Sequence, residues 1–150
     1  MIYDFTTAIV RTGTAHKLAK ASALVKQQGY RLKVWDAYRP VSAQRRLFEV
    51  YPDPEFVAQP NPNFSHQKGV TLDLTLAHPD GSELTMPTAF DDFTAAAHRD
   101  APRTALQEKN YQLLDTAMDE LYAYMNQDRI ESMLAHYRGV TEEYVWRMPD

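Results

Sequence analysis

Two stretches in the N-terminal third of the chain repeat apolar residues at helical spacing. Residues 15–28 carry the first pattern, and Gly29 follows it as a candidate C-cap. Residues 42–51 carry a shorter pattern in which Leu47 and Phe48 face inward. We therefore predict a helix over each stretch. The apolar positions of the first are Leu18, Ala21 and Val25.

A longer helical pattern occupies the C-terminal part of the chain, where Thr104 begins a helix with one broad apolar face. Asp128 is a candidate N-cap for a further helix, which continues through Tyr137 and ends at Gly139. We therefore predict two successive helices that meet before Asp128. The apolar face of the first comprises Leu106, Leu113, Leu114, Ala117, Met118, Leu121 and Met125.

Strand patterns lie between these helical stretches. Residues 32–35 form a short apolar run, and residues 70–77 read Val-Thr-Leu-Asp-Leu-Thr-Leu-Ala, which is rich in β-branched residues. The dipeptide formed by Asp80 and Gly81 is typical of a hairpin turn. We therefore predict that residues 70–77 pair with residues 83–86 across this turn.

Three further segments complete the outline. Residues 52–63 hold four prolines and two asparagines, and residues 87–103 have no regular pattern, so both are predicted as loops. Residues 141–147 are predicted as an edge strand. There is no internal repeat. The pattern as a whole predicts an α+β fold, a single domain over residues 1–150 with a small antiparallel sheet packed against helices.

The composition of the chain argues against several kinds of partner and metal ligand. The chain has 150 residues, of which 44% are hydrophobic, so it can bury a substantial core. Its net charge of -4, without a basic run, argues against nucleic-acid and membrane partners. The absence of cysteine excludes thiolate zinc ligands and fits the cytoplasm, as does the lack of a signal-peptide pattern. We therefore expect a cytoplasmic protein, and the sequence gives no indication of its oligomeric state.

His66 and Asp73 are the first candidate functional pair. They lie seven residues apart, His66 at the end of a loop and Asp73 within the strand pattern, with Gly69 between them to let the backbone turn back. Zinc binds imidazole nitrogen and carboxylate oxygen readily, and a catalytic zinc usually has three protein ligands. The pair therefore suits two ligands of a zinc site. An ordinary strand with an incidental histidine is the alternative.

Arg39 is the second candidate. It closes the run Asp-Ala-Tyr-Arg-Pro over residues 36–40, where Pro40 favours an extended conformation for the residue before it. An arginine held at a strand end can bind a carboxylate or an oxyanion through two parallel hydrogen bonds. A surface arginine in a salt bridge is the alternative.

The two motifs together resemble those of the D-alanyl-D-alanine dipeptidase family, the zinc peptidases of the vancomycin-resistance type. The family's Asp-x-Tyr-Arg-Pro element is similar to residues 36–40. Its second element, Ser-x-His-x-x-Gly-x-x-x-Asp, matches at His66, Gly69 and Asp73. The resemblance extends over residues 3–118, which is most of the chain.

The resemblance implies a fold, a cofactor and a reaction. The fold is hedgehog/D,D-peptidase-like, with the zinc site at the sheet and one zinc ion per chain, bound by His66 and Asp73. The substrate is a small molecule, the dipeptide D-Ala-D-Ala, which the family hydrolyses in cell-wall metabolism. Arg39 would hold the oxyanion that develops on the peptide carbonyl, and Glu143 would act as the general base.

The C-terminal tail departs from the family pattern. The family carries Glu-Trp-Trp-His, and residues 141–147 resemble a distorted form of it, with Glu143 in the place of the general base. Trp146 occupies the position of the third zinc ligand, and Arg147 stays protonated and cannot bind zinc. His136 is a candidate substitute ligand, with an ordinary surface histidine as the alternative.

Three hypotheses follow for function. The first is an active zinc D,D-dipeptidase. The second is a degenerate relative that binds a D-amino-acid peptide or a protein partner without cleaving it, because Trp146 replaces the expected histidine. The third is a D,D-carboxypeptidase that acts on peptidoglycan stems.

Overall fold

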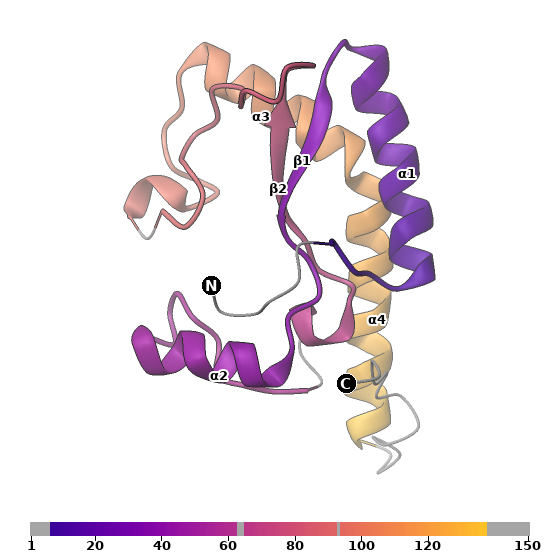
Figure 1. Ribbon diagram of the computed structural model, residues 1–150, viewed down its shortest axis with the longest axis vertical. Coiled ribbons are helices and arrows are strands. Elements are labelled where there is room, and N and C mark those ends of the chain that lie inside the picture. Colours follow the sequence, from indigo (N-terminus) through magenta and orange to yellow (C-terminus); the bar gives the residue numbers. More distant parts are fainter. Residues whose placement is uncertain (1–6, 63–64, 93, 138–150) are drawn as a thin grey trace.

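The computed structural model describes residues 7–62, 65–92 and 94–137, and it is an α+β structure of four helices and a small sheet (Figure 1). Within helix α4, the side chains are described as far as residue 131. In chain order the elements are α1 (Thr12–Gln27), β1 (Arg31–Asp36), α2 (Val41–Val50), the 3-10 turn η1 (Ser65–Lys68), β2 (Asp73–Ala77), the 3-10 turn η2 (Ala95–Ala97), α3 (Ala105–Ala117) and α4 (Asp119–Tyr137).

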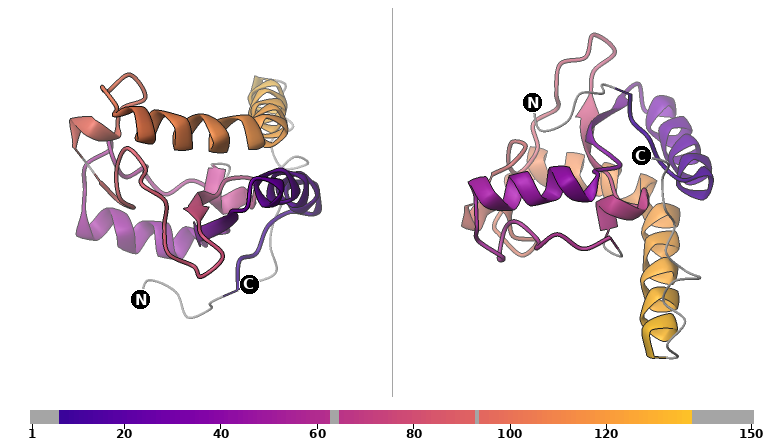
Figure 2. Two further views of the ribbon diagram at one scale, coloured as in Figure 1. Left: turned by 90° about the horizontal axis from the view of Figure 1, so that it is seen from above. Right: turned by 60° about the horizontal axis from the view of Figure 1, so that its bottom comes forward.

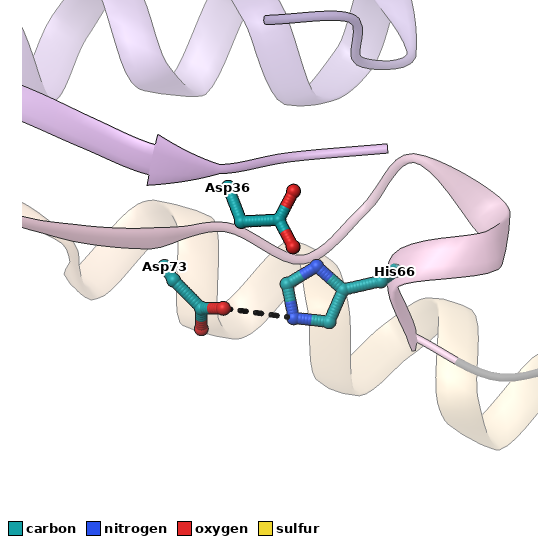
Figure 3. A group of neighbouring side chains, drawn as sticks. All are labelled: Asp36, His66 and Asp73. Atoms are coloured by element: carbon teal, nitrogen blue, oxygen red, sulfur yellow. Dashed lines mark ion pairs between the residues drawn. The ribbon is translucent and has the colours of Figure 1, made fainter. Parts of the chain in front are cut away.

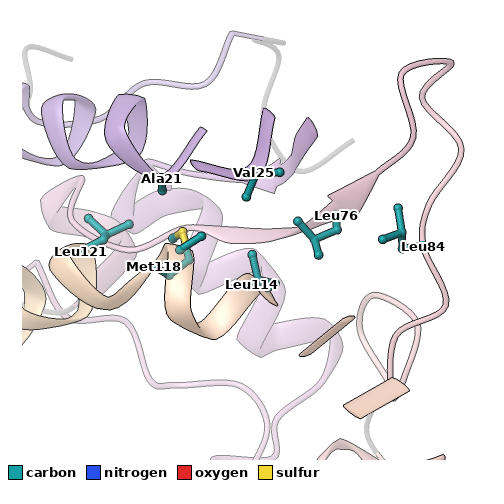
Figure 4. Packing of buried hydrophobic residues seen from close by; sticks show 8 residues of the cluster. Ala21, Val25, Leu76, Leu84, Leu114, Met118 and Leu121 are labelled. Carbon is teal, nitrogen blue, oxygen red and sulfur yellow. The ribbon is translucent and has the colours of Figure 1, made fainter. Parts of the chain in front are cut away.

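The hydrophobic core lies between the sheet and helices α1, α3 and α4 (Figure 4). Val25 of α1, Leu76 of β2 and Leu121 of α4 are fully buried there. Burying an aliphatic side chain of this size stabilises a fold by roughly 1.5–3 kcal/mol. Helix α2 lies at the other end of the sheet, away from this core (Figure 1). The core therefore does not cover the end of β1 and the start of β2, which lie towards α2 and can form other contacts (Figure 1).

Strands β1 and β2 form the two-stranded antiparallel sheet, which has an irregular register at one end. Val34 pairs with Leu74, yet the next pair joins Asp36 to Asp73, so β1 has one additional residue, Trp35, at this point. This is the arrangement of a β-bulge, which redirects side chains locally and often occurs next to functional sites. The bulge places the two aspartates opposite each other.

The predicted hairpin between residues 70–77 and 83–86 forms only next to its turn. The turn forms, with Gly81 at φ 91°, but only a single bridge follows it, between Ala77 and Glu83. Beyond that bridge, a side chain of α3 replaces the neighbouring strand as hydrogen-bond partner of the backbone: Asn110 donates to the carbonyl oxygen of Thr85 at 2.8 Å. Strand β2 pairs instead with β1, of which residues 32–35 were predicted as a strand without a partner.

The predicted boundary between the last two helices is wrong. Thr104 caps the N-terminus of α3 as expected, in a capping box with Gln107. The helix then ends at Ala117, and α4 runs on in a different direction through Asp128 (Figure 2). Asp128 is therefore not an N-cap. Leu106, expected on the buried face, is 53% exposed.

The break between α3 and α4 has no proline or glycine to mark it in the sequence. Met118 is buried at the bend beside Leu121, so the same apolar pattern supplies both helices with core residues. A helical pattern does not encode a change of direction. The edge strand predicted for residues 141–147 and the helix end predicted at Gly139 lie outside the described residues. Within the described ranges, no helix is both long and apolar enough to span a membrane.

Candidate metal centre

Three side chains with metal-binding atoms meet where β1 ends, η1 turns and β2 begins: Asp36, His66 and Asp73 (Figure 3). Their ligand atoms all lie within 4.8 Å of one another. Asp36 and Asp73 are brought there by the irregular register of the sheet. The turn that carries His66 ends at Gly69, whose φ of 68° is in the left-handed region that favours glycine.

Hydrogen bonds fix the orientation of the His66 ring. Its Nδ1 lies 2.8 Å from the carbonyl oxygen of Ala37. Since a carbonyl oxygen only accepts, Nδ1 must carry the proton. The backbone of the two segments is also connected, since the N–H of Arg39 donates to the carbonyl oxygen of His66 at 3.1 Å. A histidine held in this way through one nitrogen presents the other, Nε2, to a metal ion.

The unprotonated Nε2 of His66 lies next to the carboxylate of Asp73. Nε2 of His66 lies 3.5 Å from Oδ2 of Asp73. With Nδ1 protonated, a neutral ring and a carboxylate present two acceptors to each other, and the pair is favourable only when a proton or a cation lies with it. Imidazole nitrogen and carboxylate oxygen are a donor set that suits zinc. The residues present therefore fit two ligands of a zinc ion.

Asp36 is engaged with Arg39. Its Oδ2 accepts hydrogen bonds from Nε and Nη2 of Arg39 at 2.8 and 2.5 Å, and its Oδ1 accepts from the N–H of Ala37 at 2.9 Å. Two N–H groups of the guanidinium thus converge on one carboxylate oxygen of Asp36. Nη2 of Arg39 also lies 3.6 Å from Oδ2 of Asp73. The predicted pair and the predicted arginine thus form one cluster, with Asp36 as their connection.

The cluster opens into a cavity of about 710 Å³ between the sheet, α2 and the loop after residue 87. Trp35 packs against Phe90 on one side, with ring centroids 4.7 Å apart. Asp91 lines the cavity with a φ of 54°. Burial raises the pKa of Asp91, and the nearby Asp73 carboxylate raises it further. The cavity therefore holds a carboxylate outside the metal cluster.

Sequence reasoning missed the roles of Asp36 and Asp91 in this site. The fork between Asp36 and Arg39 joins residues three apart, so the Asp-x-x-Arg spacing within residues 36–39 was the available signal. The place of Asp91 in the cavity depends on the path of an irregular loop, which local sequence patterns do not determine. Glu143, Trp146 and Arg147 lie outside the described residues.

The other candidate ligand cannot be placed at the site. His136 belongs to the last turn of α4. Its side chain is outside the described part of the chain, and no contact to the metal cluster is assigned to it.

Two comparisons bear on this site. A family model described as D-ala-D-ala dipeptidase matches residues 1–121. The D-alanyl-D-alanine dipeptidase of Escherichia coli (strain K12) is 30% identical over 118 residues, which are 78% of this chain and 61% of that protein. The chain thus spans less than two thirds of the length of this relative. The family match includes the whole cluster and ends before Glu143.

Proposed function

This chain belongs to the D-Ala-D-Ala dipeptidase family, and on that premise we propose that it is a zinc-dependent peptidase that hydrolyses D-Ala-D-Ala in cell-wall metabolism. The observation that carries the proposal is the pair formed by His66 and Asp73. The Nε2 lone pair of His66 and a carboxylate oxygen of Asp73 lie 3.5 Å apart, so one zinc ion could bind both. The ring of His66 is 13% exposed and is fixed through Nδ1, so the position of Nε2 beside Asp73 is fixed as well.

The metal ligands in this proposal are His66 and Asp73, with one zinc ion per chain. A bound zinc would supply a water molecule whose pKa lies near neutrality. Glu143 would accept the proton of the attacking water and deliver it to the leaving amine. Asp36 would act on Arg39, since both of its oxygens are already engaged in hydrogen bonds.

Arg39 is suited to hold the developing oxyanion. Among the described residues, three of the five N–H donors of this guanidinium have acceptors, two at Asp36 and one at the side chain of Gln44. The other two, on Nη1 and Nη2, are available on a group that is 13% exposed and close to Asp73. A fixed donor in such a place stabilises charge that appears during the reaction and needs little rearrangement to do so.

Asp91 provides a site for the other end of the substrate. A free dipeptide carries an α-ammonium group, and recognition of that group in a cavity calls for a carboxylate. Asp91 lines the same cavity as the cluster and is separate from it. We therefore propose that Asp91 binds the substrate ammonium group, which would favour a dipeptide taken whole.

The experiment combines metal analysis with a product assay. The protein is loaded with zinc and dialysed, zinc is measured by elemental analysis, and D-alanine released from D-Ala-D-Ala is detected with ninhydrin. His66→Ala and Asp73→Ala should lose both zinc and activity. His98→Ala, a change at an exposed histidine outside the cluster, is the matched control and should retain both. Zinc retention by the two cluster variants would contradict the ligand assignment.

A second function is favoured by one observation, the presence of Trp146 where the family has a zinc-binding histidine. A chain without the third ligand could bind a D-amino-acid peptide and leave it intact. Isothermal titration with D-Ala-D-Ala separates the two functions. Binding without release of D-alanine, in the presence of zinc, would establish the binding protein.

We also propose that the protein works in the cytoplasm on a free small dipeptide, without a nucleic-acid or membrane partner. Its net charge of -4 and its lack of cysteine support this proposal. Fractionation of cells that produce the tagged protein from its own gene tests the location.

A further inference from the structure

Gln44 is a buried polar residue beside the candidate metal centre. It lies in α2, is only 3% exposed and lines the cavity. Glutamine is seldom buried unless its amide is hydrogen-bonded, since an unpaired buried amide is costly. The partners of this amide therefore indicate why it is placed there.

The amide of Gln44 connects three separate segments. Its Oε1 accepts from Nη1 of Arg39 at 2.7 Å and from Nε2 of Gln67 at 3.3 Å. Its Nε2 donates to the carbonyl oxygen of Ala58 at 2.7 Å. The orientation of the amide is unambiguous, because a guanidinium can only donate and a carbonyl can only accept. Gln44 thus links Arg39, the residue after His66 and the loop after α2.

Two side chains hold the Arg39 guanidinium at two different places. Asp36 binds the edge formed by Nε and Nη2, and Gln44 binds Nη1. With Asp36 alone, the guanidinium could turn about that contact, and its Nη2 is already 3.6 Å from Asp73. With both partners, the plane and the direction of the free donors are fixed. Donors aimed before the reaction starts are the ones that stabilise a transition state most.

We propose that Gln44 is a positioning residue for Arg39, which it holds at the angle needed to meet the developing oxyanion. The inference rests on the proposed function of Arg39. Gln44 itself need not touch the substrate. Its second hydrogen bond, to Ala58, anchors the glutamine from the opposite side, so the acceptor offered to Arg39 has a fixed position.

The first test does not depend on activity. In ¹⁵N NMR spectra of the protein, restricted rotation about the Arg39 Nε–Cζ bond keeps its Nη hydrogens distinct, and Arg39→Lys assigns the signals. Gln44→Met, of similar size but without the amide, should speed this rotation at least severalfold. Gln44→Glu keeps an acceptor for Arg39 and should leave the rotation slow. Gln112→Met, on the exposed surface of α3, is the control.

An unchanged rotation rate in folded Gln44→Met would overturn the proposal. If Gln44→Met fails to fold, Gln44→Glu decides it. In that case the proposal requires the rotation about the Arg39 Nε–Cζ bond to be at least as slow in Gln44→Glu as in the parent. Faster rotation in Gln44→Glu would contradict it.

The second test is a double-mutant cycle on the active enzyme. Gln44→Met should lower kcat roughly 10-fold or more, since a small misplacement of a catalytic group is costly, with little change in KM or zinc content. In the Arg39→Lys background the same change should alter kcat less than about twofold. Equal effects in both backgrounds would show that Gln44 acts elsewhere, for example through Ala58. A parent without activity would count against the proposed function, while the NMR result would still decide the role of Gln44.

Discussion

The direction of each hydrogen bond determines what the side chains at the metal centre can do. The carbonyl oxygen of Ala37 can only accept, so it fixes the proton of His66 on Nδ1 and leaves Nε2 for a ligand. In the same way, Asp36 and Gln44 both accept from Arg39, which fixes its remaining donors. Every one of these bonds joins residues of the first 70 positions, all within the family match.

The first prediction at this scale concerns Arg39. Arg39→Lys keeps the charge but loses the planar fork that Asp36 and Gln44 hold. A donor to the oxyanion acts mainly in the transition state, so kcat on D-Ala-D-Ala should fall roughly 100-fold or more with a much smaller change in KM. Steady-state kinetics measure both. Zinc content should stay constant, and an unchanged kcat in an active parent would make Arg39 a structural residue.

The second prediction concerns the charge of Asp91. Burial and the Asp73 carboxylate raise its pKa, so the ionised form destabilises the fold above that pKa. Below the usual pKa range of aspartate, the folded and unfolded states are both protonated and the destabilisation disappears. Asp91→Asn suits the positive φ and should raise the Tm of the metal-free protein at pH 7 by only about 1 °C, since Asp91 is exposed and its charge is screened.

Thermal unfolding at several pH values checks this expectation. The difference between Asp91→Asn and the parent should shrink as the pH falls and vanish in acid. A difference that grows in acid would reverse the sign and contradict the proposed cause.

At the scale of elements, α4 is connected to the turn that carries His66. Asp128 forms a salt bridge with Arg11 at 2.8 Å and another with Lys68, whose side chain is 3% exposed. Lys68 lies two residues after His66, and the hydroxyl of Thr14 and the N–H of Arg11 both donate to the carbonyl oxygen of Gly69. Contacts from the start of α1 and from α4 thus fix the end of the turn that carries His66.

Asp128→Ala should therefore destabilise the protein. Asp128→Ala removes the carboxylate that faces the buried Lys68 ammonium and Arg11, and the loss of one partner of a buried ion pair costs about 3 kcal/mol. For a chain of this length, that loss lowers the Tm by roughly 5–10 °C, as measured by calorimetry. Glu131→Ala, on an exposed part of α4, is the control and should have little effect. Equal Tm values for the two variants would mean that the Asp128 pairs contribute nothing.

The sequence predicted most of the helices because their caps and apolar spacing are local signals. Gly29 ends the first helix with a φ of 83°, and Thr104 starts α3 through its capping box. Pairing between strands is not local, so the expected hairpin is limited to one bridge beside its turn, and the sheet between β1 and β2 was not foreseen. The bulge at Trp35 is equally invisible in the sequence, because it depends on how the two strands meet. That is also why Asp36 was seen as part of a motif and not as a partner of the metal pair.

On the scale of the whole molecule, the proposed zinc ion would join parts of the chain that are far apart in sequence. His66 and Asp73 are contributed by η1 and β2. A third ligand after α4 would tie the C-terminal tail to the sheet. A ligand that binds only the folded state stabilises it by an amount that grows with its concentration relative to its Kd, about 2.7 kcal/mol at a hundredfold excess over Kd. Zinc affinity therefore reports on whether the tail completes the site.

The last prediction uses this relation to find the third ligand. With Trp146 in the family's histidine position, the parent should retain only part of its zinc through dialysis, and Trp146→His or Arg147→His should retain more of it and gain more Tm from added zinc. Tyr144→His supplies a histidine at a tail position where the family has tryptophan, not a zinc ligand, and is the control. If the parent already holds one zinc per chain and neither change increases retention, the third ligand lies elsewhere. Loss of that zinc in His136→Ala would then identify the ligand as His136 of α4, and the tail would be free of the metal.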